Sequence, residues 1–222
     1  MSTLTARLAA LRESHAAKLK PEISELLDQQ LALLHQDPGF DGVPKVGERA
    51  PSFALEDQHG TTVSSTVLLA RGPLVVSFYR GTWCPYCNEE IAALSEVYDA
   101  IRAEGASLVA VSPQSAASAE SYRKVHPVPF PILVDTDARI AEQFGLAYTY
   151  SAALKTLYLN AFKNDLAEIN AGATWRMTVP GRFVIDSDGI IADAQFDPDY
   201  RFRPDPADTL RVLRRLRTGS AA

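Results

Sequence analysis

The stretch LVVSFYRGTWCPYCNEE, residues 74–90, decides the fold because it joins a strand pattern to a helix pattern through a pair of cysteines. Residues 74–79 form an apolar run typical of a buried strand, and apolar residues then recur at helical spacing as far as Ile101. The chain has 2 cysteines, Cys84 and Cys87, and both lie between these segments. A strand, a short turn and Cys-x-x-Cys at the start of a helix predict dithiol redox chemistry.

Cys84 is predicted to be the attacking sulfur and Cys87 the resolving sulfur. The free N–H groups and the dipole of a helix N-terminus stabilise an anion, and a thiolate there has a pKa below the usual value of about 8.5. Because Cys84 falls at this end of the helix, we expect it to be the more ionised and the more exposed thiol. Cys87 lies one turn further along the same side of the helix, within reach for a disulfide.

Two alternatives to a redox site are a zinc site and a pair of inert buried thiols. Tetrahedral zinc needs further ligands, but there is no second cysteine pair, and the histidines are scattered at His15, His35, His59 and His126. A lone cysteine is often buried and inert, whereas this spacing after a strand favours a reactive pair. We therefore expect neither a metal nor another cofactor.

Composition and charge are those of an ordinary globular protein. Of 222 residues, 46% are hydrophobic and 22% are charged, and the formal net charge is −5. This balance gives no electrostatic footprint for nucleic acid. No apolar run reaches the roughly 18 residues of a membrane span, and the first residues lack the pattern of a secretory signal. We expect a cytoplasmic protein without nucleic-acid or membrane partners, in a compartment where Cys-x-x-Cys is more often catalytic than structural.

The chain divides into an N-terminal amphipathic helical arm, residues 1–40, and a main redox domain, residues 41–222. Pro21 is expected to start the second helix of the arm. The main domain alternates strand and helix patterns, with strands predicted over 74–79, 108–111, 132–134, 183–185 and 190–192 and helices over 86–103, 115–125 and 206–217. A short helix with Thr136 or Asp137 near its cap is expected before Gly145. This order predicts an α/β, thioredoxin-like fold, with a central mixed sheet and helices on both faces.

Several separated segments resemble the peroxiredoxin-like proteins of the alkyl hydroperoxide reductase/thiol-specific antioxidant (AhpC/TSA) superfamily. The similar segments are VSFYRGTWCPYCNEE (76–90), KVGERAPSF (45–53), VPGRFVID (179–186) with DG (188–189), DYR (199–201) and PDP (204–206). They correspond in order to the active site, the opening, the late strand with its hairpin, and the closing segment of that superfamily. The WCPYC motif itself is closer to thioredoxins and glutaredoxins.

This resemblance implies a thiol-dependent peroxidase. Cys84 would attack the O–O bond of hydrogen peroxide or an organic hydroperoxide and become a sulfenic acid. Cys87 would then condense with it to an intramolecular disulfide. A thioredoxin- or glutaredoxin-like donor would reduce that disulfide through a mixed disulfide.

The resemblance also implies substrate-binding roles for neighbouring residues. Thr82 is expected to offer its hydroxyl to the sulfur or the peroxide, or else to bond within its turn. Pro180 would be a cis-proline placed against the reactive cysteine, or else a trans proline that opens a strand. Arg182 is a candidate to stabilise the thiolate or peroxide by charge-assisted hydrogen bonds, and Arg80 is a second such candidate.

Two departures from the superfamily pattern leave other functions open. Ser77 and Gly81 stand where typical peroxiredoxins have a proline and a threonine or serine. A thiol–disulfide oxidoreductase and a redox-sensing interaction protein are therefore alternatives. The arm packs either on its own domain or on a second subunit, so a homodimer is a further possibility. Residues 146–172 are rich in tyrosine and give no readable pattern, and they are candidates to cap the site.

Overall fold

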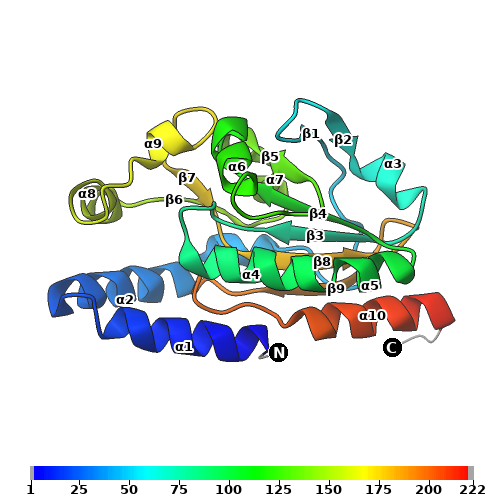
Figure 1. Cartoon of the computed structure of the whole chain (residues 1–222), viewed down its shortest axis with the longest axis horizontal. Coiled ribbons are helices and arrows are strands. Elements are labelled where there is room, and N and C mark those ends of the chain that lie inside the picture. Colours follow the sequence, from blue (N-terminus) through cyan, green and yellow to red (C-terminus); the bar gives the residue numbers. More distant parts are fainter. Residues whose placement is uncertain (1–2, 220–222) are drawn as a thin grey trace.

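A five-stranded sheet in the order β5-β4-β3-β8-β9 forms the centre of the molecule (Figure 1). The structure, a computed structural model, describes residues 3–219, so the outermost residues of the two predicted domains, 1–2 and 220–222, lie outside the described residues. β3, β4 and β5 run parallel, whereas β8 is antiparallel to both β3 and β9. The strands are β3 (Leu74–Phe78), β4 (Ser107–Ser112), β5 (Ile132–Val134), β8 (Gly181–Ile185) and β9 (Ile191–Phe196). The predicted thioredoxin-like α/β fold with a mixed sheet is confirmed.

Helices cover both faces of this sheet. The helices are α1 (Leu4–Ala16), α2 (Pro21–His35), α3 (Ser65–Leu69), α4 (Pro85–Glu96), α5 (Tyr98–Ala103), α6 (Ala116–Arg123), α7 (Arg139–Gln143), α8 (Ala152–Asn160), α9 (Leu166–Ile169) and α10 (Pro206–Thr218), with 3-10 turns at Pro38–Gly42 and Thr136–Ala138. The single helix predicted over 86–103 is interrupted at Val97, where φ is −105° and ψ is 4°. Ser95 bonds back to the carbonyl of Ile91 at 2.8 Å, a contact that bends helices.

The central strands are apolar on both faces because successive side chains point to opposite sides of a sheet. Val75 and Val184 join the core on the side of α1, α4, α5, α6 and α10. Val76 and Phe183 join the second core, which α3 and α7 cover. Burial on both faces explains why the sequence shows these strands as continuous apolar runs.

The arm packs on its own domain. Leu4 and Leu8 of α1 are buried in the same core as α4, and Arg7 bonds to the α4 carboxylate of Glu96 at 2.7 Å. Pro21 is the first residue of α2, as predicted. On α2, Gln30 accepts a hydrogen bond from Ser151 at the start of α8. The arm therefore lies against the end of the sheet where α4 begins (Figure 1).

Several short elements escape the sequence patterns. β1 (Ala54–Glu56) and β2 (Thr62–Ser64) form one two-stranded sheet, and β6 (Ala147–Thr149) and β7 (Arg176–Thr178) form another. The unreadable residues 146–172 thus contain β6, α8 and α9, which are too short to show a period. Thr136 and Asp137 lie near the N-cap of the short helix α7, as expected, and the N-cap itself is Ala138. Asp135 accepts the backbone N–H groups of Ile140 and Ala141 at 2.9 Å.

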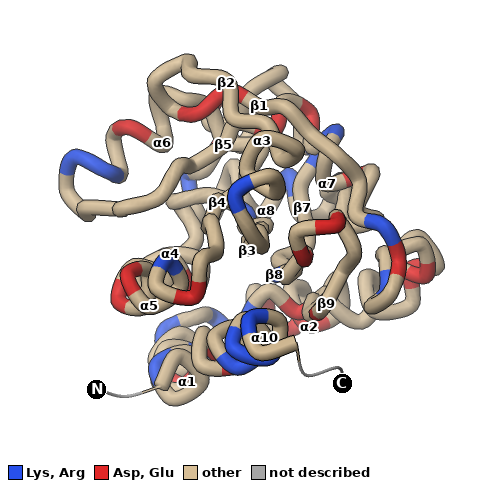
Figure 2. Tube along the Cα trace, turned by 90° about the vertical axis from the view of Figure 1, so that its right-hand side faces the viewer, with Lys and Arg blue, Asp and Glu red and all other residues tan. Residues whose placement is uncertain are grey.

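Acidic and basic residues are scattered over the described trace, with basic positions gathered on α10 (Figure 2). Glu104 pairs with Arg214 and Arg217 of this helix. Over residues 3–219, every helix is too short or too polar to cross a bilayer.

Candidate active site

Cys84 occupies the N-cap of α4, and Pro85 is the first residue of the helix. The Cys84 carbonyl accepts the backbone N–H groups of Cys87 and Asn88 at 3.0 and 3.1 Å, which starts the helix at the cysteine pair. The predicted position of Cys84 at the helix tip is therefore confirmed. The expectation that its side chain would be exposed is wrong, since Cys84 is 1% exposed and Cys87 0%. Both are free thiols.

A cavity of about 300 Å³ opens onto Cys84. Most of its walls are aromatic or aliphatic, and the arm and α8 contribute to it. They include Leu19, Leu27, Trp83, Tyr86, Tyr158, Phe162 and Tyr200. A second cavity of about 210 Å³ shares Leu27, Arg80, Tyr158 and Tyr200 with the first and continues between α2 and α8. Because the arm and α8 cover the sulfur, the burial of Cys84 is a property of the tertiary structure.

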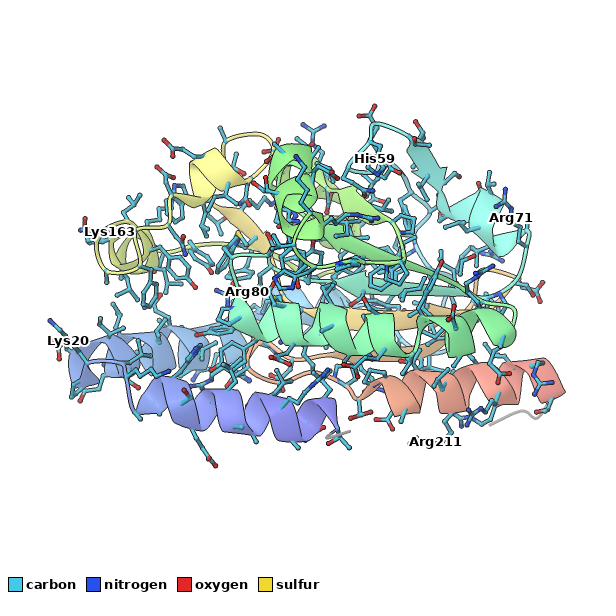
Figure 3. The ribbon with its side chains drawn as sticks, in the orientation of Figure 1. Lys20, His59, Arg71, Arg80, Lys163 and Arg211 are labelled. Atoms are coloured by element: carbon cyan, nitrogen blue, oxygen red, sulfur yellow. The ribbon has the colours of Figure 1, made fainter. Side chains whose placement is uncertain are left out.

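Arg80 lies beside the sulfur of Cys84. It follows β3 in the turn before α4 (Figure 3), and its Nη1 donates to Cys84 Sγ at 3.6 Å. Its Nη2 donates to the hydroxyls of Tyr150 and Tyr158, each at 2.5 Å. The guanidinium also stacks on the ring of Tyr200, 3.8 Å from its centroid. These contacts hold a fully buried positive charge beside the sulfur.

The surroundings separate the pKa values of the two thiols. Burial raises the pKa of Cys84, but a hydrogen bond from Cys87 and the charges of Arg80 and Arg203 outweigh it and lower the pKa to about 5. Burial and the neighbouring Cys84 raise the pKa of Cys87. At neutral pH the pair therefore holds one thiolate, on Cys84, and one thiol, on Cys87.

A buried polar layer lies between the sheet and α4. Glu90 of α4 accepts Arg182 Nη2 at 2.8 Å and Arg203 Nε at 2.6 Å, and it also accepts the hydroxyl of Ser77 at 3.2 Å. Ser77 and Arg182 are register partners on β3 and β8, so strand alternation points both towards α4. Arg203 Nη2 donates to Cys87 Sγ at 3.3 Å. Each sulfur of the pair thus has its own arginine.

Of the residues predicted to bind substrate, Thr82 and Arg182 make their hydrogen bonds to groups other than the cysteine sulfurs. The Thr82 hydroxyl bonds to Gln114 Oε1 at 3.1 Å, and its role towards the sulfur or the peroxide stays a prediction. Arg182 is buried with Glu90 and Thr209 and makes no hydrogen bond to either cysteine. Pro180 is buried just before β8 and its peptide bond is trans, which corrects the predicted cis bond. Arg80, the second candidate, holds the place expected of Arg182.

Gly81 stands at the position where typical peroxiredoxins have a threonine or serine, and its backbone shows why no side chain fits there. Its φ is 143°, and a Cβ there would lie 2.4 Å from Trp83 Nε1. Only glycine fits this backbone without strain. The hydroxyl groups near Arg80 come instead from Tyr150 and Tyr158.

Sequence reasoning missed four residues of the site: Glu90, Tyr150, Tyr158 and Arg203. Glu90 lies six residues after Cys84 on the side of α4 that carries apolar residues, and a carboxylate there is a signal of a buried ion pair. The two tyrosines lie within the unreadable residues 146–172, where composition was the sole signal. Arg203 lies just beyond the segment 199–201 that carried the resemblance. In the part of the chain that the structure describes, His, Cys, Asp and Glu side chains form no group of three suited to a metal.

A thioredoxin-like fold with two buried thiols at a helix N-terminus and an arginine on each defines a thiol-based redox protein. The model of the AhpC/TSA family matches residues 46–194, more than half of the chain. The chain belongs to the AhpC/TSA family, and the predicted superfamily is confirmed.

Similar proteins include peroxiredoxins and one disulfide oxidoreductase. A chloroplastic peroxiredoxin Q from Sedum lineare is 26% identical over 212 residues, which cover 93% of each chain. The thiol-disulfide oxidoreductase ResA from Bacillus subtilis is 30% identical over 102 residues, which cover 46% of this chain and 56% of that one. Among solved structures, peroxidoxin BcpB from Mycobacterium tuberculosis has a TM-score of 0.60 at 24% identity and covers 77% of this chain and 97% of that one. The last comparison supports the fold.

Proposed function

We propose that this protein is a thiol-dependent peroxidase that reduces hydrogen peroxide or organic hydroperoxides. The single observation that carries the proposal is the placement of a low-pKa Cys84 against Arg80 at the floor of a cavity. The Cys84 thiolate attacks one peroxide oxygen, the O–O bond breaks, and water or an alcohol leaves after it takes up a proton. Cys84 becomes a sulfenic acid, and Cys87 displaces its oxygen as water to form the disulfide.

Arg80 stabilises the charge that moves through this reaction. Its guanidinium lies beside the thiolate before attack and can donate to the oxygen that becomes negative as the O–O bond breaks. The Nε of Arg80 and the Nε1 of Trp83 are buried and have no hydrogen-bond partner among the described residues. The Nε–H of Arg80 can therefore turn to a peroxide oxygen, whereas Trp83 Nε1 packs against the backbone of Gly81. Tyr150 and Tyr158 keep the guanidinium in place.

Replacing Cys87 with serine tests the peroxidase reaction directly. We expect Cys87→Ser to react with one equivalent of peroxide and to accumulate the Cys84 sulfenic acid, because the resolving sulfur is absent. Mass spectrometry after trapping with dimedone measures this product, and stopped-flow fluorescence of the neighbouring Trp83 measures its rate.

The matched control is Cys84→Ser, which retains Cys87 and should give no rapid phase and no dimedone adduct. Oxidation of Cys84 in the wild type at the rate of an ordinary free thiol would contradict the proposal. So would a trapped sulfenic acid on Cys87 in place of Cys84.

The reaction should stay fast at mildly acidic pH. Since the pKa of Cys84 is lowered to about 5, the thiolate fraction is constant above about pH 7 and halves near pH 5. We expect the rate of wild-type oxidation by peroxide to follow this fraction, measured by stopped flow from pH 4.5 to 9. Circular dichroism at each pH controls for unfolding. A half-maximal rate near pH 8–9, the range of an ordinary thiol, would contradict the assignment.

A thiol–disulfide oxidoreductase is the second candidate function. The WCPYC motif and the partial similarity to ResA favour it. The test is reduction of insulin or of a small mixed disulfide by the wild type, with Cys84→Ser as control. Disulfide reduction faster than peroxide reduction would replace the first proposal with this one. The redox-sensing alternative predicts a change of partner or oligomeric state on oxidation, which light scattering of the two redox states measures.

We propose a thioredoxin- or glutaredoxin-like protein as the electron donor and the cytoplasm as the location. The site supports this because it needs a steady supply of thiol reductant, and the cytoplasm keeps thiols reduced. Peroxide consumption coupled to each candidate donor tests the identity of the electron donor. Microscopy of the tagged chain tests the location. The homodimer stays a prediction, measured by light scattering.

A further inference from the structure

The loop between β9 and α10 places a buried arginine on the second sulfur of the pair. The side chain of Arg203 is 1% exposed, and its Nη2 donates to Cys87 Sγ at 3.3 Å. Its Nη1 donates to the carbonyls of Tyr200 and Phe202, and its Nε donates to Glu90 Oε2 at 2.6 Å. The loop backbone and α4 thus fix the guanidinium and leave one N–H aimed at the sulfur.

The charges around the pair leave one positive charge for each sulfur. Glu90 carries one negative charge and faces two buried guanidinium groups, Arg182 and Arg203. One positive charge is therefore not neutralised by the carboxylate, and Arg203, one of the two cations that share Glu90, contacts Cys87. Arg80 supplies the other, beside Cys84. A buried cation needs an anionic partner. Arg203 shares the carboxylate of Glu90 with Arg182, and its other sulfur-side contact, Cys87, can become a second anion as a thiolate.

We propose that Arg203 is a catalytic residue of the resolving step, holding Cys87 as a thiolate when it attacks oxidised Cys84 and again when it leaves during reduction. This inference rests on the proposed function, in which Cys84 is oxidised before Cys87 reacts. In the attack, the S–S bond forms and the bond between Cys84 sulfur and oxygen breaks. The sulfur of Cys87 is oxidised, that of Cys84 is reduced, and the departing hydroxide takes a proton and becomes water.

Reduction of the disulfide reverses this step and uses the same contact between Arg203 and Cys87. A thiolate of the donor dithiol attacks Cys84 Sγ, and Cys87 leaves as a thiolate that Arg203 stabilises. The second thiol of the donor then displaces Cys84 and closes the donor disulfide. Two electrons pass from the donor to the pair, and both cysteines return to the reduced state.

The contacts of Cys87 predict that its thiol ionises more readily after Cys84 has been oxidised. Burial raises the pKa of Cys87, and the hydrogen bond and negative charge of Cys84 raise it further, while Arg203 and Arg80 lower it. Oxidation of Cys84 to a neutral sulfenic acid removes the Cys84 charge, so the two arginines then act against burial alone. The titratable and charged groups that face Cys87 are Tyr79, Arg80, Cys84, Glu90, Tyr122 and Arg203. Of these, Arg203 makes the hydrogen bond to its sulfur from outside the pair.

Rapid mixing of reduced protein with hydrogen peroxide separates the oxidation of Cys84 from the attack of Cys87 as two successive changes in Trp83 fluorescence. Mass spectrometry of quenched samples assigns the first change to the sulfenic acid and the second to the disulfide. In Arg203→Gln we expect the first phase to stay within about threefold of the wild type and the second to slow about 10- to 100-fold. The pH midpoint of the second phase should rise by about one to two units, the usual effect of an opposite charge at this distance. Arg203→Lys, which keeps the charge, should restore part of the rate.

Arg201→Gln is the matched control in the same loop, because Arg201 pairs with Asp28 and Asp199 and not with a sulfur. It should leave both phases unchanged. An unchanged second phase and pH profile in Arg203→Gln would overturn the inference, and so would equal slowing of both phases. If Arg203→Gln does not fold, Arg203→Lys decides: slowing of the second phase alone supports the role, because lysine lacks the fixed donor on Cys87, and equal slowing of both phases overturns it.

A second oxidant keeps this test independent of the peroxidase proposal. Cys84 attacks the small disulfide 5,5′-dithiobis(2-nitrobenzoate) and releases one coloured thiolate, and closure by Cys87 releases the second. If wild-type Cys84 reacts slowly with peroxide, the proposed function fails, yet the second release still reports on Arg203. Slower second release in Arg203→Gln supports the inference, and an unchanged rate overturns it.

Discussion

Arg80→Met should lower the rate constant for oxidation of Cys84 by peroxide about 10²- to 10³-fold, the usual cost of removing one preorganised donor from an active site. The substitution removes the charge that lies 3.6 Å from Cys84 Sγ. It also removes the N–H groups of Arg80 that could meet the peroxide oxygen, and the pKa of Cys84 should rise because Arg80 contributes to its lowering. Stopped-flow rates at several pH values separate the two effects, since the loss that persists at high pH reports on the peroxide and not on thiolate formation.

Arg71→Met is the matched control for this prediction. Arg71 is an exposed arginine that precedes β3, whereas Arg80 follows the same strand (Figure 3). The Arg71→Met variant should react with peroxide at the wild-type rate. Arg80→Lys should recover part of the loss, because it keeps the charge without the fork of donors that reaches Tyr150 and Tyr158. A rate for Arg80→Met within threefold of the wild type would remove Arg80 from the mechanism.

Glu90→Gln should reduce the free energy of unfolding by about 3–5 kcal/mol, the cost of breaking a buried ion pair from one side. Glu90 is 1% exposed and binds the guanidinium groups of Arg182 and Arg203. Without its charge, two buried cations have no carboxylate. Urea unfolding of the reduced protein, followed by circular dichroism, measures the difference.

The neighbouring Glu89→Gln provides the comparison on the same helix. Glu89 pairs with Arg7 at 3.3 Å, but its side chain is 38% exposed. Water screens such a pair, so its loss should cost less than about 1 kcal/mol. Equal stability losses in the two variants would show that the network around Glu90 contributes no more than a surface ion pair.

The main strands and helices could be read from the sequence because each carries a strong local signal. β3, β4 and β8 are buried on both faces and so appear as short apolar runs. α10 has a proline in its first turn and arginines in its last. By contrast, β1, β2, β6 and β7 have three residues each, too few for a period. Their pairing depends on contacts that no local pattern records.

The sequence predicted those parts of the site whose residues are neighbours in the chain. Cys84 and Cys87 are three residues apart, and the strand and helix that flank them fixed their roles in the prediction. The assignment of Arg182 failed because proximity in a family motif does not say which way a strand residue points. β8 places Arg182 opposite Ser77, and both face Glu90 below the sulfur pair. Ser77, which departs from the usual pattern, thereby becomes part of the polar layer.

The sequence by itself determined the thioredoxin-like fold and the AhpC/TSA resemblance, and it predicts attack by Cys84 and resolution by Cys87 from local spacing and helix-terminal electrostatics. The tertiary structure alone decided which charges act on those sulfurs. Arg80 comes from the turn after β3, Arg203 from a loop 116 residues beyond Cys87, and the tyrosines that hold Arg80 from the residues around α8. Hydrogen bonds and buried charges act through space over a few ångströms, so only folding brings these groups to the thiols.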